Sequence, residues 1–163
     1  MSTWQLAIGE VVCTASSAES VLELPIGLAA LMQRVLVTDP PRPEELTNAI
    51  GEVIDHLDDL LRVWPDALEA DWVLTGLDAV AIAGVEVGHE PVLPVTLPRG
   101  AVEEVFRTMA TEAAADRCLN PGLPRQQVRS IVAGCCVAVA IMRRLHLETI
   151  TIDLLMTDHE VRT

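Results

Sequence analysis

Residues 22–46 read "LELPIGLAALMQRVLVTDPPRPEEL" and carry the clearest signals of secondary structure in the chain. It passes from alternating apolar residues into a Pro-Ile-Gly corner, a short helical run and a proline cluster. Alternation with a period of two is typical of a strand, and the prolines at 40 and 41 break the helical run. Pro43 suits the first turn of a further helix. The stretch therefore predicts a strand, a short helix and the beginning of a second helix.

The segments around this corner extend the pattern. Residues 3–9, 10–16 and 20–26 are short runs rich in β-forming or alternating residues, so they predict an antiparallel meander. Beyond the proline cluster, apolar residues recur at three- and four-residue steps, which predicts a long amphipathic helix. These apolar positions are Leu46, Ile50, Val53, Leu57, Leu60 and Leu61.

The second half of the chain alternates between strand and helix signals. Residues 71–76, "DWVLTG", predict a buried strand, and residues 77–88 predict either a short helix or an irregular apolar connection. Residues 99–119 predict one amphipathic helix, residues 131–142 a buried helix, and residues 148–156 a closing strand. The resulting order, βββ-α-α-β-α-α-β, indicates an α/β fold with a mixed sheet and helices on its faces.

Composition limits the classes of function. The 163 residues suit one domain, which we place at residues 1–163. The chain has 24 acidic residues against 11 basic ones, and all the basic ones are arginine. A net charge of −13 repels phosphate backbones, so we expect no nucleic-acid partner and no anionic membrane surface. The longest apolar run, 12 residues, is short of the ~20 that cross a bilayer.

The four cysteines do not form a CxxC pair, and the N-terminal residues lack the features of a secretory leader. These features predict a cytoplasmic protein with reduced thiols. Cys135 and Cys136 lie in the buried helical run, where cysteine most often serves as a small apolar residue.

Several blocks resemble the exopolyphosphatase and guanosine pentaphosphate phosphatase (Ppx/GppA) family. Residues 24–27, LPIG, match that family's LPLG corner, and residues 39–46, DPPRPEEL, match its DPPTPEEL element. Residues 122–152, "GLPRQQVRSIVAGCCVAVAIMRRLHLETITI", are similar to its GLxPxRADVIVAGxxILxxLLxxLGxxxIxV block. The blocks keep the family's order along nearly the whole chain.

The resemblance implies a single ribonuclease H-like lobe of the actin-like ATPase superfamily, the second of the two lobes in family members. Residues 3–9 align with the end of the family's DIGGGSTELVLG segment, so the glycine-rich phosphate loop would precede this sequence. The first lobe, which carries the Glu that activates water, would also lie outside it. The resemblance therefore implies a chain that does not hydrolyse polyphosphate by itself, with no catalytic residue and no cofactor of its own.

The motifs of the second lobe are altered as well. The family's GVAGT turn corresponds to residues 73–77, VLTGL, which keep a glycine and lose the Thr hydroxyl. The family's RAD corresponds to Gln127, Val128 and Arg129. A weak phosphate or nucleotide site could persist at Thr75, Gly76, Arg125 and Arg129. The alternative is that Gly76 only makes a turn and the arginines only cover the surface.

Two acidic clusters have the residue types of metal ligands: Asp55, His56, Asp58 and Asp59 in "DHLDD", and Asp158, His159 and Glu160 in "TDHE". Solvated acidic surface explains both, so we expect no metal.

For function, the preferred hypothesis is an inactive lobe that forms a homodimer or binds another protein in a regulatory role. The alternative is half of a split phosphoanhydride hydrolase that another chain completes.

Overall fold

The computed structural model describes residues 2–154, and its core is one six-stranded mixed sheet. The order of the strands across the sheet is β3-β2-β1-β4-β6-β5. The first three strands form the predicted antiparallel meander, whereas β1, β4 and β6 run parallel. The strands are β1 (Thr3–Ala7), β2 (Cys13–Ser16), β3 (Val21–Leu24), β4 (Asp71–Thr75), β5 (Val95–Pro98) and β6 (Thr149–Asp153).

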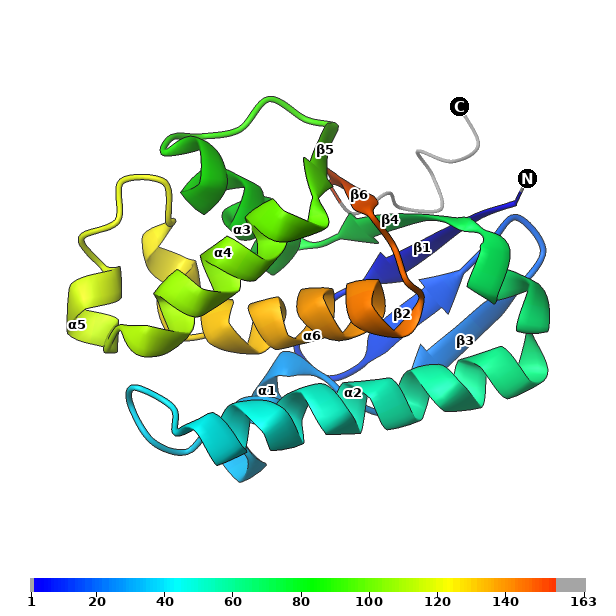
Figure 1. The fold of residues 1–163 in the computed structure, drawn as a ribbon, viewed down its shortest axis with the longest axis horizontal. Helices are drawn as coiled ribbons and strands as arrows, with labels where there is room; N and C mark the ends of the chain where they lie inside the picture. Colours follow the sequence, from blue (N-terminus) through cyan, green and yellow to red (C-terminus); the bar gives the residue numbers. More distant parts are fainter. Residues whose placement is uncertain (1, 155–163) are drawn as a thin grey trace.

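The helices form one layer against this sheet (Figure 1). They are α1 (Leu28–Arg34), α2 (Pro43–Val63), α3 (Leu77–Val87), α4 (Arg99–Thr111), α5 (Ala114–Arg117) and α6 (Ile131–Arg144), with 3₁₀ turns η1 (Pro65–Glu69) and η2 (Arg125–Gln127). The two parallel crossovers, β1 to β4 and β4 to β6, step in the same direction across the sheet. Because such crossovers are right-handed, their helices lie on the same face. The apolar helix α6 is central, since α1, α2, α3 and α4 all contact it.

The helix-covered face of the sheet holds the apolar core. Alternate residues of the central strands are buried there, among them Leu6, Leu74 and Ile152. Trp4 and Trp72 stack at 5.6 Å between ring centroids, near the start of their two parallel strands. The period-two pattern read from the sequence is therefore confirmed.

The opposite face of the sheet carries mostly uncharged residues at its centre, together with the carboxylate of Asp153. No helix within residues 2–154 packs on this face, as the helix layer lies on the other side. Its half-buried residues are Gln5, Ala7, Thr14, Ser16, Val73, Thr151 and Asp153. We call this set the open face.

The proline-rich stretch is held by the carboxylate of Glu45 in the first turn of α2. This carboxylate accepts hydrogen bonds from the backbone N–H groups of Val37 (2.7 Å), Thr38 (2.9 Å) and Arg42 (3.1 Å), and from the Thr38 hydroxyl. The Thr38 hydroxyl bond and these backbone bonds lower the pKa of Glu45 to about 2. Glu45 therefore supplies the helix-start contact that Arg42, in place of a capping Thr, does not.

A second carboxylate of the stretch divides the helix predicted over residues 99–119. That prediction is wrong at its C-terminal end, because the chain leaves helical geometry at Glu112 and Ala113 and restarts as α5. Both oxygens of Asp39 accept the backbone N–H of Ala114 at 3.1 Å, and Asp39 also pairs with Arg117. The break is thus stabilised by a residue 75 positions away in the sequence.

The structure also defines two neighbouring segments, residues 77–87 and 95–98. Residues 77–87 form a helix, so the first of the two alternatives for this segment is confirmed. The sequence reading missed β5, an antiparallel edge strand of four residues that pairs with β6. Its short length and its terminal proline give little strand signal, and proline is tolerated at such an edge.

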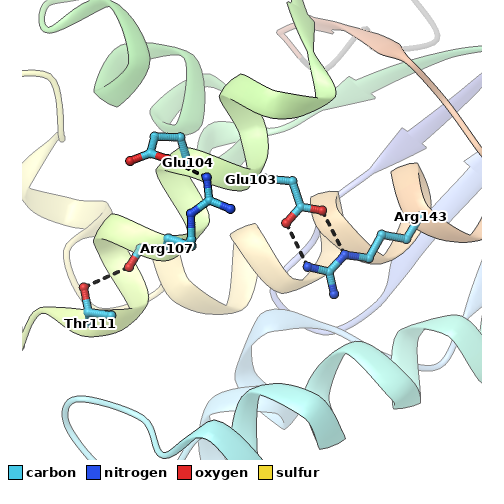
Figure 2. Close-up of polar contacts among 5 residues, drawn as sticks. All are labelled: Glu103, Glu104, Arg107, Thr111 and Arg143. Carbon is cyan, nitrogen blue, oxygen red and sulfur yellow. Dashed lines mark hydrogen bonds and ion pairs between the residues drawn. The ribbon is translucent and has the colours of Figure 1, made fainter.

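Figure 2 shows how α4 is attached to α6. Glu103 and Arg143 form a two-pronged ion pair, with Nε–Oε1 and Nη2–Oε2 distances of 2.8 Å. The Arg143 guanidinium holds the pKa of Glu103 below its usual value. On the exposed side of α4, Arg107 pairs with Glu104, and the Thr111 hydroxyl donates to the Arg107 carbonyl. These exposed contacts contribute little, so the Glu103 pair is the main polar link between the helices.

Candidate functional site

A cavity lies at the carboxyl ends of the parallel strands β1 and β4. Its volume is about 860 Å³, and Ile8, Gly76 and Asp78 line it together with residues of α1 and of the segment before α6. We call it the Asp78 pocket. Open α/β sheets bind ligands outside the carboxyl ends of their strands, so the fold itself makes this the first candidate site.

The backbone at the floor of the pocket requires glycine at position 76. Gly76 has φ +110°, and a Cβ there would lie 2.8 Å from the carbonyl oxygen of Ile8. The Ile8 N–H donates to the Thr75 carbonyl at 3.0 Å, which ties the ends of β1 and β4 together. Helix α3 begins directly after this turn, without a side-chain cap. The turn and the first residues of α3, Gly76, Leu77 and Asp78, therefore line the cavity.

A carboxylate of the chain itself occupies the first turn of α3. Asp78 is only 5% exposed, and the Ser130 hydroxyl at the start of α6 donates to its Oδ1 at 2.6 Å. A Cβ at Gly134 would lie 2.8 Å from the Asp78 Cβ, so α6 approaches α3 closely here. Burial raises the pKa of Asp78, the Ser130 bond opposes this rise, and the charge of Glu10 adds to it.

The charges around the pocket disfavour phosphate at the start of α3. Asp78 and Glu10 line the cavity with two carboxylates, and Arg129 is the one basic residue that lines it. Asp78 already places negative charge at the helix N-terminus, where an anion would otherwise bind. An incoming phosphate would therefore meet repulsion from two acidic groups.

The structure brings together two of the four residues predicted for an anion site. Gly76 and Arg129 both line the Asp78 pocket. Arg125 is exposed in η2 and does not line this pocket, and Thr75 is fully buried between Ala7 and Asp153. The Thr75 hydroxyl has no hydrogen-bond partner among residues 2–154.

Sequence reasoning missed Asp78 and Glu10 as residues of the site. A signal for Asp78 existed, because it is the one charged residue in the apolar run "LDAVAIAGV", residues 77–85. A single carboxylate at the start of such a helix is a candidate for a buried functional group. Glu10 gave no comparable signal, since it follows β1 in a turn that only the fold places beside α3.

Within residues 2–154, no three His, Cys, Asp or Glu side chains gather as a metal site. The acidic cluster at 158–160 lies outside the described residues. No described helix combines the length and apolarity needed to span a membrane.

Comparison with known proteins gives a result for the fold alone. No protein-family model matches this sequence, and no curated protein matches it in sequence. A solved Ppx/GppA phosphatase from Aquifex aeolicus superposes with a TM-score of 0.86 at 16% identity, over 99% of this chain. The chain has the fold of one Ppx/GppA lobe. The motif resemblance to this family is therefore confirmed at the level of the fold.

Further Ppx/GppA-type structures give similar values. An exopolyphosphatase-like protein superposes with a TM-score of 0.83 at 15% identity over 94% of this chain. An exopolyphosphatase from Cytophaga hutchinsonii superposes with a TM-score of 0.78 at 12% identity over 93%. This chain spans 56%, 54% and 53% of the three neighbours, about half of each.

Proposed function

We propose that this Ppx/GppA-like lobe does not hydrolyse phosphoanhydride bonds by itself and acts by binding another protein, in the first instance a second copy of itself. The observation that carries the proposal is the charge of the Asp78 pocket. Asp78 and Glu10 place two carboxylates where a phosphate site of this fold would need hydrogen-bond donors and cations. The chain has no lysine to offset them.

The open face supports the interaction part of the proposal. Its half-buried residues are uncharged except for Asp153, although the chain as a whole has a charge of −13. A charge-poor patch in so acidic a chain suits burial against another protein surface. We therefore expect this face, rather than the acidic exterior of α2, to form the interface.

The activity test is phosphate release from polyphosphate and from guanosine pentaphosphate by the purified chain. We expect no release above the buffer blank, whereas a complete Ppx/GppA phosphatase in the same assay releases phosphate. Intrinsic turnover that Arg129→Gln abolishes would refute the proposal. A change in the rate of the complete enzyme on adding this chain would support a regulatory role.

The interaction test is light scattering coupled to size-exclusion chromatography. We expect a homodimer that Val73→Arg converts to a monomer, because the substitution places a charge at the centre of the open face. Val92→Arg is the control, since Val92 is 86% exposed in a loop. A monomer at high concentration that also captures no defined partner would refute the interaction role.

The fraction of each neighbour that this chain covers favours one alternative. A lobe that spans about half of the Ppx/GppA structures would suit a split phosphatase, in which another chain supplies the other half. Mixing this chain with a separate first lobe that carries the phosphate loop and the Glu base would then restore phosphate release. We would expect that activity only if the second chain also supplies most of the phosphate contacts.

A further inference from the structure

Most of the surface inside the Asp78 pocket is apolar, and part of this apolar surface is open to solvent. Ile8 and Leu28 are buried in its wall, whereas the large side chains of Leu77 and Leu154 are exposed beside it. The cavity volume of about 860 Å³ lies in the range that takes small organic molecules, about 300–1,000 Å³. Exposed apolar side chains that gather around a cavity are typical of a binding site. The walls therefore favour a ligand with an apolar body.

One polar side chain of the pocket, that of Gln127, is buried without a hydrogen-bond partner. Gln127 ends η2, is only 7% exposed and lines the cavity. Its backbone N–H donates to the Pro124 carbonyl, but its side-chain amide makes no hydrogen bond within residues 2–154. The amide is not sealed inside the fold, because the fully enclosed side-chain atoms without a partner belong to Thr75 and Arg117. It is therefore available to a molecule in the cavity, as an acceptor and as a donor.

The Asp78 carboxylate also has an oxygen without a donor. Ser130 donates to Oδ1, whereas Oδ2 accepts no hydrogen bond among the described residues and is not one of the enclosed atoms. Arg129 lines the same cavity, but it forms no ion pair with Asp78. Burial raises the pKa of Asp78, and the charge of Glu10 adds to this rise. A cation beside Oδ2 would stabilise the ionised carboxylate.

We propose that the Asp78 pocket binds an organic cation, an ammonium group on an apolar body, which donates hydrogen bonds to Asp78 Oδ2 and to the amide oxygen of Gln127. Helix α3 and η2 contact each other, so these two side chains come from neighbouring parts of the cavity wall. Glu10 adds a second carboxylate against the single guanidinium of Arg129, so the lining favours a cation over an anion.

The apolar walls and the carboxylate together select this class of ligand. A bare metal ion would leave the apolar walls uncovered, and a neutral molecule would leave the charge of Asp78 without a partner. The site requires no hydrolysis and shares no residue with the open face. Failure of the proposed function would therefore leave it standing.

The first test compares three ligands that share one apolar body, in calorimetric titrations of the full chain at constant ionic strength. They are 4-phenylbutylamine, which is cationic at neutral pH, the neutral 4-phenylbutanol and the anionic 4-phenylbutyrate. We expect saturable binding of the amine, binding of the alcohol that is weaker by at least about tenfold, and no binding of the acid. No saturable response to the amine, or an alcohol that binds as tightly, would overturn the proposal.

Variants test the two polar groups separately. Asp78→Asn keeps an oxygen that can accept the Ser130 bond but removes the charge, and Gln127→Met removes the amide at nearly the same side-chain length. Each should weaken the binding of the amine by at least about tenfold. Asp55→Asn is the matched control, because Asp55 is exposed on α2 and does not line the cavity, and its affinity should stay within about twofold of the parent. Equal losses in Asp55→Asn and Asp78→Asn would overturn the proposal.

Gln127→Met also separates a binding role from a structural one. Because the amide has no partner in the described fold, the substitution should leave the midpoint of urea unfolding unchanged while the affinity for the amine falls. A lower midpoint with unchanged affinity would identify Gln127 as a structural residue and overturn its assignment to the site.

The last test locates the ligand in the parent chain. In an NMR titration with 4-phenylbutylamine, the side-chain amide of Gln127 and the methyl groups of Ile8 and Met32 should shift together and saturate at one affinity. Shifts that centre on the acidic exterior of α2, at Asp58 and Asp59, would indicate general attraction to the acidic surface and overturn the assignment. This readout needs no variant, so it holds whether or not Asp78→Asn folds.

Discussion

Asp39→Ala should destabilise the lobe, because the Asp39 carboxylate makes two contacts with α5. The carboxylate caps α5 through the Ala114 N–H, and losing such a cap costs about 1 kcal/mol. It is also the carboxylate partner of Arg117, whose side chain is only 5% exposed. An unmet hydrogen bond to a charged group costs about 1.5–3 kcal/mol.

The Asp39 side chain is itself 52% exposed, so in the variant water can partly take the place of its carboxylate as the hydrogen-bond partner of Arg117. The lower end of the range of about 1.5–3 kcal/mol therefore applies. The two contributions overlap because one carboxylate makes both contacts, which gives an expected loss of about 2 kcal/mol in the free energy of unfolding. Urea titrations followed by circular dichroism should show a lower midpoint with an unchanged slope. The Ala114 amide should also exchange hydrogen faster.

Asp55→Ala is the control for removing one negative charge, because Asp55 is exposed on α2 and makes no hydrogen bond within the described residues. We expect it to change the free energy of unfolding by less than about 0.5 kcal/mol. A loss for Asp39→Ala no larger than that of this control would refute the reasoning. So would an unchanged exchange rate at Ala114.

Three further predictions concern other parts of the lobe. Glu45→Gln should destabilise the folded lobe at neutral pH. Folding lowers the pKa of Glu45 from 4.5 to about 2. The carboxylate therefore contributes fully to the free energy of unfolding above about pH 4.5, and this contribution is lost as the pH falls toward 2. The difference between parent and variant in urea titrations should therefore shrink across that range, and a constant difference would argue against the pKa basis. Gly122→Ala should lower the free energy of unfolding by at least about 2 kcal/mol, because its Cβ would lie 1.9 Å from a backbone oxygen of α3. Gly51→Ala on α2 is the control, since a Cβ there would meet open space. It should raise the free energy of unfolding by about 0.5–1 kcal/mol, and thermal unfolding measures both changes. Of the four thiols, only Cys118 is exposed, so an aromatic disulfide reagent should modify one thiol quickly in the folded protein and none in Cys118→Ser.

Local sequence signals were enough for most of the elements, because those elements follow short-range rules. The meander, α2, β4 and α6 each lie where apolar periodicity or breakers place them, and the LPIG and DPPRPEEL blocks identify the order of a Ppx/GppA lobe. Burial of Cys135 and Cys136 in α6 is likewise confirmed. The weak points were β5 and the end of α4, where the local signal is short or is overridden.

The periodicity of each element, the order of the elements and the acidic character of the chain can be seen in the residues alone. The roles of the polar residues depend on the folded structure, because their partners are distant along the chain. Asp39 reaches α5 across 75 residues, and Asp78 reaches Ser130 across 52. Burial adds to this for Asp78, because a carboxylate that would be solvated on a surface is here hydrogen-bonded inside the fold at the start of α3.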